Sequence, residues 1–209
     1  MIRPVSLAFL GMCTAMFVSV AAGQALEFES GGLKYQALTR AGVTVMVAPL
    51  PTRILGYSIL QVAVSNGSVE PQEVEPEKFQ FRGLVGRPIQ ALSARAVVND
   101  VLERAGRNDV GRLIGVYEAA LFGNSNLELR FGYEARRKDA MAIGGTKMRA
   151  AAAAAAIVLG SRKLEPGESI DGAVFVPTSN KPLGAGTLVL EAAGETFEFT
   201  LVPEPVAVR

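Results

Sequence analysis

The stretch KMRAAAAAAAIVLG, residues 147–160, contains seven consecutive alanines, Ala150 to Ala156. Alanine is the strongest helix former, because its side chain loses no rotamer entropy when a helix forms. The segments before and after this stretch alternate apolar and polar residues, as half-buried strands do. The stretch therefore predicts a helix, capped by Thr146 and Gly160, within a chain that is otherwise mainly β.

The apolar part of this helix, Ala150 to Leu159, is too short to cross a membrane. Ten helical residues rise about 15 Å, which is about half of a bilayer core. A face made of alanine lets a neighbouring element approach closely. We therefore expect the helix to pack inside the helical segment or against the sheets, and a surface for partners or self-association is the alternative.

Helical periodicity begins upstream of the alanines, after Gly83. Pro88 suits the first turn of a helix that ends at Gly106, and Asn108-Asp109 can cap a second helix that ends at Gly123. A further helix is predicted over 134–142. A short alternating segment, 127–133, is consistent with a strand between the helices.

The remaining segments have the period of two that is typical of strands. An acidic segment punctuated by proline, 70–77, is interpreted as a solvated connector, and Ala48-Pro49-Leu50-Pro51 as a break between strands. Seven short strands separated by turns indicate a β-sandwich. The strands are predicted near 33–39, 43–48, 55–65, 77–82, 170–176, 187–191 and 196–201.

Two stretches of the β part carry a resemblance to a known class of domain. Tyr57 to Asn66 is a hydrophobic strand that ends in an Asn turn, and the turn Leu164 to Ser169 leads into the strand Gly172 to Pro177. Both stretches resemble those of exported bacterial immunoglobulin-like sandwich domains of unknown function. The resemblance covers the β portion of the chain and implies an immunoglobulin-like antiparallel β-sandwich.

The fold class that we expect is mainly β with an α insertion. Residues 26–83 and 163–209 would form the sandwich, and residues 84–162 would form one helical insertion between its fourth and fifth strands. If this division is correct, replacing 84–162 by a short linker leaves a folded, β-rich domain.

The first 25 residues have the order of segments found in a secretory signal peptide. Arg3 is followed by an apolar run from about Leu7 to Val20 and then by small residues up to Ala25. Cleavage there would also remove Cys13, the only cysteine, so the mature chain could form no internal disulfide. An uncleaved membrane anchor over residues 5–22 is the alternative. We therefore expect an exported protein, periplasmic, associated with the outer envelope or extracellular.

The composition excludes most common hydrolase sites. The chain has no histidine, and Cys13 lies in the predicted signal peptide, so a Ser-His-Asp triad, a Cys-His dyad and a His- or thiolate-ligated metal are excluded. No catalytic, metal-binding or cofactor-binding residue is predicted. A pair of carboxylates or a Ser-Lys dyad remains as catalytic machinery. At Ser161-Arg162-Lys163 and Ser179-Asn180-Lys181 the Ser-x-x-Lys spacing fails by one residue, which favours loops there. The chain's four aspartates, which we place in capping, helix-surface or turn contexts, are Asp100, Asp109, Asp139 and Asp171.

Charge separates the helical part from the β part. Residues 84–163 hold thirteen Lys or Arg against seven Asp or Glu, a balance of +6, and the other residues from 26 onward have a balance of −6. The basic helices either dock on the acidic sandwich or bind an anionic partner. The candidate interaction residues are Arg136, Arg137, Lys138, Lys147 and Arg149. Nucleic acid is not expected, because basic and aromatic residues do not interleave.

These observations favour a non-catalytic exported interaction or assembly module of a bacterial cell envelope. Its partner would be a protein or an anionic envelope polymer. Two alternatives stay open: a glycan-cleaving hydrolase that uses carboxylates alone, and a peripheral membrane-surface protein.

Overall fold

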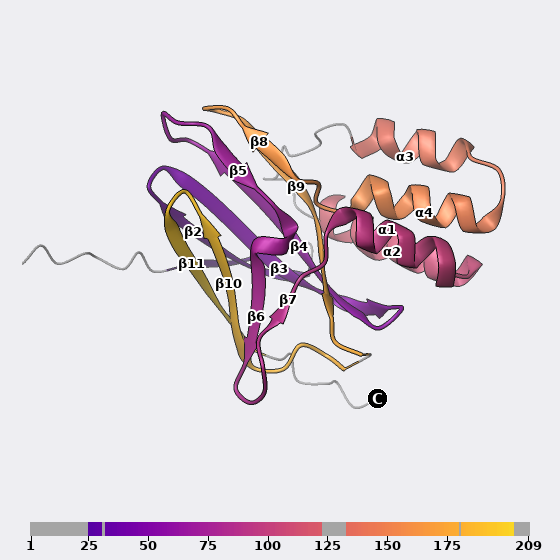
Figure 1. Ribbon diagram of the computed structural model, residues 1–209, viewed down its shortest axis with the longest axis horizontal. Helices are drawn as coiled ribbons and strands as arrows, with labels where there is room; N and C mark the ends of the chain where they lie inside the picture. The colour runs from indigo at the N-terminus through magenta and orange to yellow at the C-terminus, as the bar shows by residue number, and fades with distance from the viewer. Residues whose placement is uncertain (1–24, 31, 123–132, 180, 203–209) are drawn as a thin grey trace, which may run out of the picture.

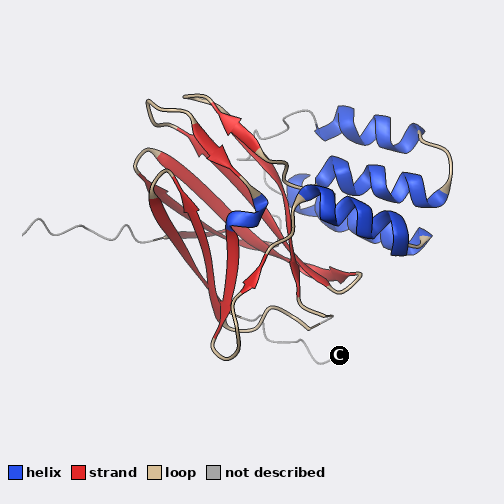
Figure 2. Ribbon diagram, in the orientation of Figure 1, coloured by secondary structure: helices blue, strands red, loops and turns tan. Residues whose placement is uncertain are grey.

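The computed structural model describes residues 25–30, 32–122, 133–179 and 181–202. It is mainly antiparallel β-sheet with four helices, and these form three layers (Figure 1). The helices lie on one side of the sheets, as the blue and red elements of Figure 2 show. All of the predicted signal peptide except Ala25 lies outside the described residues, as does most of the strand predicted near 127–133. Tyr133 itself begins a helix.

Two larger antiparallel sheets face each other in a sandwich-like arrangement. The large sheet has the order β1-β2-β3-β4-β9, and the small sheet has the order β11-β10-β6-β7. A separate ribbon pairs β5 with β8. The bounds of the large sheet's strands are Leu26–Ser30 (β1), Leu33–Arg40 (β2), Val43–Ile54 (β3), Tyr57–Asn66 (β4) and Ser169–Pro177 (β9). The others are Gln72–Val74 (β5), Phe79–Gly83 (β6), Ile89–Gln90 (β7), Arg162–Leu164 (β8), Gly186–Ala192 (β10) and Glu195–Leu201 (β11).

The four helices follow one another between β7 and β8. Their bounds are Ala94–Arg104 (α1), Arg107–Phe122 (α2), Tyr133–Ala142 (α3) and Thr146–Ile157 (α4). Within the described ranges, no helix combines the length and the apolar composition that crossing a bilayer requires.

The strands β4 and β9 of the large sheet are buried on both faces. Alternate residues of β9 point to opposite sides, so Ala173 and Phe175 pack against the helices while Val174 and Val176 pack against the small sheet. Neither side of this strand reaches solvent over most of its length, which explains why its sequence is apolar at nearly every position. The helices and the large sheet therefore share one apolar core, and the predicted division into sandwich and insertion does not divide that core.

Several local predictions were wrong. Seven strands, not four, precede the helices among the described residues. Strand β3 continues through Pro49, because a register shift against β4 between Pro49 and Arg53 accommodates the prolines. The predicted acidic connector contains β5 and a 3-10 helix, Pro76–Lys78. Pro88 precedes β7 rather than a helix; α1 starts later, where the Ser93 hydroxyl accepts a hydrogen bond from the backbone N–H of Ala96 (3.2 Å).

The predicted alanine helix is α4, and it is the centre of the helical layer. It contacts α1, α2 and α3. Five of its alanines are buried: Ala150, Ala151, Ala153, Ala154 and Ala156. Its ends differ from the prediction, since Gly145 with a φ of 83° is the N-cap, and the helix ends at Ile157, before Gly160. Small side chains on α4 allow three helices to approach one axis, which confirms that it packs internally.

The chain leaves α4 by docking directly on β9. Leu159 N–H donates to the carbonyl of Ala173 (2.9 Å), and Val158 forms an isolated parallel bridge with the same residue. A Cβ at Gly172 would lie 2.6 Å from the Leu159 Cα, so this crossing requires glycine or a displacement of backbone. The C-terminal end of α4 is thereby fixed at the edge of the large sheet.

The Asn turn that carries the sequence resemblance is a buried junction. Asn66 is fully buried at the end of β4, and its Nδ2 donates to the carbonyls of Glu70 (2.8 Å) and Leu164 (3.0 Å). Its Oδ1 accepts from the N–H of Ser68 (3.0 Å). One side chain thus joins β4, the following turn and the end of β8.

Candidate functional site

The five candidate cations all lie on α3 and on the first turn of α4, and all five are exposed. Three of them donate to carbonyls at the C-terminal ends of helices, where the backbone has unsatisfied acceptors and negative partial charge. The hydrogen bonds are Arg136 Nε to Ala156 O, Lys147 Nζ to Glu103 O and Arg149 Nε to Ile143 O, each 3.2 Å. These side chains therefore hold the helical layer together in addition to presenting charge.

The other two cations differ from each other. Arg137 forms an ion pair with Glu118 of α2, whose carboxylate also accepts a hydrogen bond from the Tyr133 hydroxyl (3.1 Å). Burial, and secondarily the neighbouring Glu118 carboxylate, raise the pKa of Tyr133 above its ordinary value. Lys138 projects from the exposed face of α3. The sequence thus located a basic surface but not the pairing within it.

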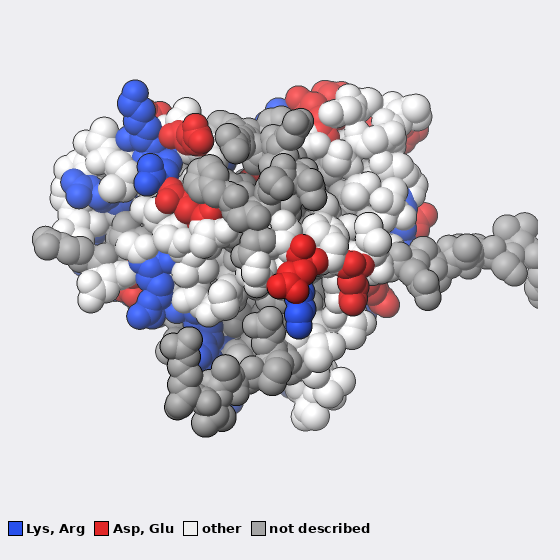
Figure 3. Space-filling model, turned by 180° about the vertical axis from the view of Figure 1, so that it is seen from behind, with Lys and Arg blue, Asp and Glu red and all other residues white. Residues whose placement is uncertain are grey.

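Charge is also separated on the folded surface. Seen from behind, most Lys and Arg side chains gather over the helical side of the molecule, at the left of Figure 3, and most Asp and Glu side chains lie toward the sheets. The helices therefore present basic charge outward, although some of it is paired with acidic groups of the same layer.

A groove crosses the C-terminal end of α4. It consists of two adjoining hollows of about 370 and about 210 Å³ that share Ala155, Val158 and Gly160. The larger hollow extends toward α1, and the smaller, more enclosed one extends toward β8 and β9. We call the two together the α4 groove. Its other lining residues are Ala94, Arg95, Val98 and Asn99 in the larger hollow, and Arg136, Arg162, Ser169, Ile170 and Asp171 in the smaller.

Three arginines from three elements line the α4 groove: Arg95 of α1, Arg136 of α3 and Arg162 of β8. Of these, Arg162 also contacts Glu168 (3.1 Å), in a pair whose side chains are 53% and 40% exposed. Exposed pairs of this kind contribute little stability and exchange readily with other anions. The groove is thus positively charged at its walls and apolar along its floor.

A buried carboxylate lies in the smaller hollow. Asp171 of β9 is 5% exposed, and its Oδ2 accepts a hydrogen bond from the hydroxyl of the fully buried Tyr117 (3.1 Å). Its Oδ1 is also buried, and no described residue donates a hydrogen bond to it. Burial raises the pKa of Asp171, against the opposing effects of the Tyr117 hydrogen bond and of the Arg136 charge. A buried acceptor without a donor is costly, so Asp171 lowers the stability of the fold at this position.

Sequence reasoning placed Asp171 in an ordinary surface or turn context, and this was wrong. The signal that was available is that Asp171 is the one charged residue in the strand 169–177. Arg95 and Arg162 were counted in the basic balance but were not singled out, because only the fold brings them to the end of α4. Of the five candidate cations, the structure places Arg136 in the groove.

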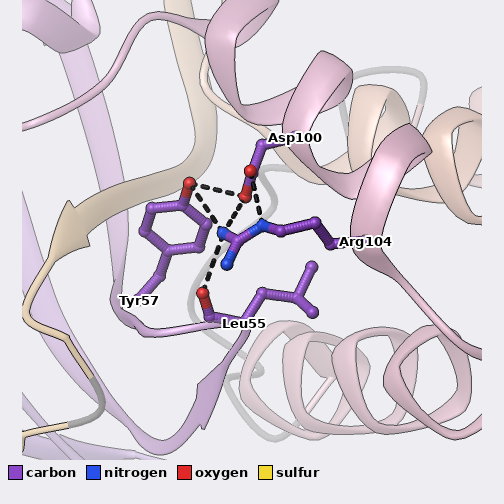
Figure 4. Close-up of polar contacts among 4 residues, drawn as sticks. All are labelled: Leu55, Tyr57, Asp100 and Arg104. Carbon is purple, nitrogen blue, oxygen red and sulfur yellow. Dashed lines mark hydrogen bonds and ion pairs between the residues drawn. The ribbon is translucent and has the colours of Figure 1, made fainter.

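A second polar cluster fastens α1 to the turn between β3 and β4 (Figure 4). The Tyr57 hydroxyl donates to Asp100 (2.7 Å), and Arg104 forms an ion pair with the same carboxylate. Arg104 also donates to the Leu55 carbonyl (3.0 Å), at a residue whose φ is 54°. The Arg104 hydrogen bond, followed by that of Tyr57, lowers the pKa of Asp100 against the effect of burial. Because each group satisfies another of the same cluster, its role is structural.

Comparisons with known proteins add little. No protein family and no curated protein sequence matches the chain. Among solved structures, the yjhA protein from Bacillus subtilis is similar over 80% of this chain and 78% of its own, with 11% sequence identity and a TM-score of 0.32. We derive neither fold nor function from a likeness of that degree.

Proposed function

We propose that the chain is a non-catalytic interaction module that holds an acidic segment of a partner protein in the α4 groove. The observation that carries this proposal is the convergence of Arg95, Arg136 and Arg162 on a groove floored by Ala155 and Val158. The arginines come from separate elements, so their convergence follows from the fold rather than from local sequence.

Charge and apolar contact have different roles in such a groove. Each exposed ion pair adds only about 0.2–1 kcal/mol, and salt screens it. The alanine and valine floor adds contact area that salt does not weaken. Binding is therefore of moderate affinity, selective for acidic segments and weakened at high ionic strength.

Export to a bacterial cell envelope belongs to the same proposal. Its support is the order of basic, apolar and small residues over 1–25. An assembly module there would join envelope proteins rather than transform a substrate.

We also propose that the sandwich is of the immunoglobulin-like class. Its support is that the chain crosses between the two larger sheets three times, from β4 to β6, from β7 to β9 and from β9 to β10. One feature differs from that class of domain: β1 to β4 form a continuous meander in one sheet, whereas immunoglobulin domains place their second strand beside their fifth.

The test is fluorescence anisotropy with a labelled pool of acidic hexapeptides, at low and at high salt. We expect saturable binding that weakens at high salt and falls about threefold to tenfold in each of Arg95→Gln and Arg162→Gln. The matched control is Arg112→Gln, at an exposed position of α2 outside the groove, which should bind as the parent protein does. Equal binding by all four proteins, or none by any, overturns the proposal.

The two alternatives predict other outcomes. A peripheral membrane-surface protein would float with anionic liposomes at low salt. A glycan-cleaving hydrolase would release reducing ends from envelope glycans, and Asp171→Asn would abolish that release. Among the described lining residues of the groove, Asp171 supplies the one carboxylate.

A further inference from the structure

The turn between β6 and β7 exposes two neighbouring apolar side chains. Leu84 is 82% exposed and Val85 is 94% exposed. Single exposed apolar residues are ordinary on a protein surface, but adjacent ones at the tip of a hairpin need a reason. The turn lies below the sheets in Figure 1, on the side away from the helical layer. It is therefore separate from the α4 groove.

A third exposed apolar side chain lies at the same end of the small sheet. Gly83, the last residue of β6, pairs with Gly186 of β10, which in turn pairs with Leu201 at the end of β11. Val202 follows directly and is 76% exposed. Apolar side chains from two separate segments of the chain thus reach solvent at one end of one sheet.

The base of the β6–β7 turn is packed tightly. Phe81 is buried, and a Cβ at Gly186 would clash with the Arg82 carbonyl oxygen and with the Phe81 ring. The N–H of Leu84 donates to the carbonyl of Ala185 (3.3 Å). The fold therefore fixes the start of the turn, and the exposure of its apolar residues does not come from a loosely attached loop.

Arginines flank the apolar pair on both sides. Arg82 lies two residues before the pair and Arg87 lies two residues after it, and both are exposed. Arg82 Nε donates to the neutral amide oxygen of Gln80 (3.0 Å). The hairpin from 79 to 90 contains no Asp or Glu, and neither arginine forms an ion pair with a described residue. The turn therefore presents apolar surface and positive charge together.

An anionic bilayer has an apolar layer behind an anionic one, which is the order of groups that the turn presents. Successive residues of an extended chain are about 3.3 Å apart, so the arginines are set back by up to about 7 Å from the apolar pair. Apolar groups at the boundary between headgroups and acyl chains lie at a depth of about 5–10 Å. The guanidinium groups would then stay among the lipid phosphates. A free inorganic anion would match the arginines but leave the apolar pair in water.

We therefore propose that the β6–β7 turn, with Val202 beside it, is a membrane-contact site that inserts Leu84 and Val85 into the headgroup region of an anionic bilayer. A contact of this size gives reversible attachment that salt weakens. The site goes beyond the proposed function, because it uses none of the residues that line the α4 groove. Attachment here and peptide binding in the groove are compatible, and each can fail without the other.

The test places a fluorescent reporter at the turn, because flotation alone would not distinguish this contact from one made by the basic helices. The chain contains no tryptophan, so Val85→Trp introduces a single one. In the full chain we expect its emission to shift to shorter wavelength when vesicles of mixed zwitterionic and anionic phospholipid are added at low salt. Lipids brominated on their acyl chains should quench it.

Val69→Trp is the matched control. Val69 is 92% exposed and follows β4, at the end of the sheets opposite to the β6–β7 turn. Its emission should be unaffected by brominated lipid. In the Val85→Trp background, Arg87→Gln should weaken vesicle binding about fivefold, as expected for one cation near an anionic surface. Leu84→Ser should weaken it about fivefold to tenfold, because an apolar side chain is lost.

Four outcomes would overturn the proposal. The first is an emission of Val85→Trp that vesicles do not shift. The second is equal quenching of both reporters, which would show that the turn has no special contact with lipid. The third is a shift that is as large on purely zwitterionic vesicles or that Arg87→Gln leaves unchanged. The fourth is an emission already at short wavelength without vesicles, which would show that the chain itself or a second copy covers the turn.

Discussion

Asp171 is a buried carboxylate that lines the groove in which we propose that an acidic segment binds. Its neighbours on β9 are apolar. An apolar side chain at this position would make the fold more stable than a buried carboxylate with one unsatisfied oxygen does. Natural proteins accept such a cost mainly at functional sites. Removing the charge should therefore stabilise the chain.

The first prediction follows from the raised pKa of Asp171. Below the ordinary pKa of 3.8 both the folded and the unfolded chain hold the proton, so the charge has no effect on stability. As the pH rises from 3.8 through the raised folded value, the unfolded state ionises first, and the free energy of unfolding falls. Asp171→Asn should thus be more stable than the parent by about 1 kcal/mol at pH 7, or about 3 °C in Tm, and equally stable near pH 3. Thermal melts across this range that show the parent to be the more stable protein at pH 7 would refute this account of Asp171.

The pKa of Asp100 is shifted in the opposite direction from that of Asp171, so its effect on stability has the opposite dependence on pH. Hydrogen bonds from Arg104 and Tyr57 lower its pKa, so its contribution is present above 3.8 and is lost as the pH falls through the lowered folded value. We expect Asp100→Asn to cost about 1 kcal/mol at pH 7, a modest value because the Arg104 side chain is 49% exposed. Denaturant titrations should show the difference closing in strong acid. Asp139→Asn, at an exposed position of α3, is the control and should change stability by less than about 0.5 kcal/mol.

For single residues, the sequence showed which side chains are charged but not which groups they contact. It placed Arg136 on a basic helix, as the structure does, but it did not show that the partners of Arg137 and Lys147 are groups on other helices. Contacts between residues far apart in the chain depend on packing that periodicity does not encode. Asp171 was missed because its importance comes from burial, and burial was known only once the helices were placed.

Among the elements, α4 is the one that the rest of the helical layer is built around. The composition predicted where this helix lies in the chain, because alanine is the strongest helix former. Its role at the centre of three helices was not implied, because alanine is equally compatible with an exposed helix. The alternation of apolar and polar residues predicted most of the strands. One error fell at the prolines of β3, where the strand continues with a shift of its register against β4.

Two adjacent alanines of α4 provide a matched pair for the next prediction. Ala154 is fully buried and Ala155 is exposed in the groove. Ala154→Leu must displace a neighbouring helix and should cost about 1–3 kcal/mol. Ala155→Leu should leave the free energy of unfolding within about 0.5 kcal/mol but weaken peptide binding by filling the groove. If Ala154→Leu proved as stable as the parent, α4 would not be the packed centre of the layer.

The whole molecule is a stack of helices, large sheet and small sheet, in which β4 and β9 of the middle layer are buried on both faces. The sequence predicted the β-rich fold and the contiguous run of helices. It did not predict that the helices complete a core, although β4 and β9 are apolar on both faces and a two-layer sandwich buries only one face of each strand. This difference changes the expected result of removing the helices.

The structure leads us to expect that replacing residues 84–162 by a short linker abolishes cooperative folding. The deletion would expose Tyr57, Ile59 and Phe175 on the large sheet. Exposing each such side chain to water lowers the free energy of unfolding by about 1.5–3 kcal/mol. Circular dichroism and thermal melting of the deletion variant provide the measurement. A cooperative melt with intact β signal would instead favour the independent sandwich that the sequence analysis predicted.

The central claim is that the end of α4 is a binding site for an acidic segment, and its most direct test is an NMR titration of the full chain with the pool of acidic hexapeptides. We predict that the backbone amide signals that shift most belong to Ala155, Val158, Gly160 and Asp171, and that these shifts are strongly reduced in Arg162→Gln. Shifts confined to the outer face of α3 or to the small sheet, or no shifts at all, would contradict it.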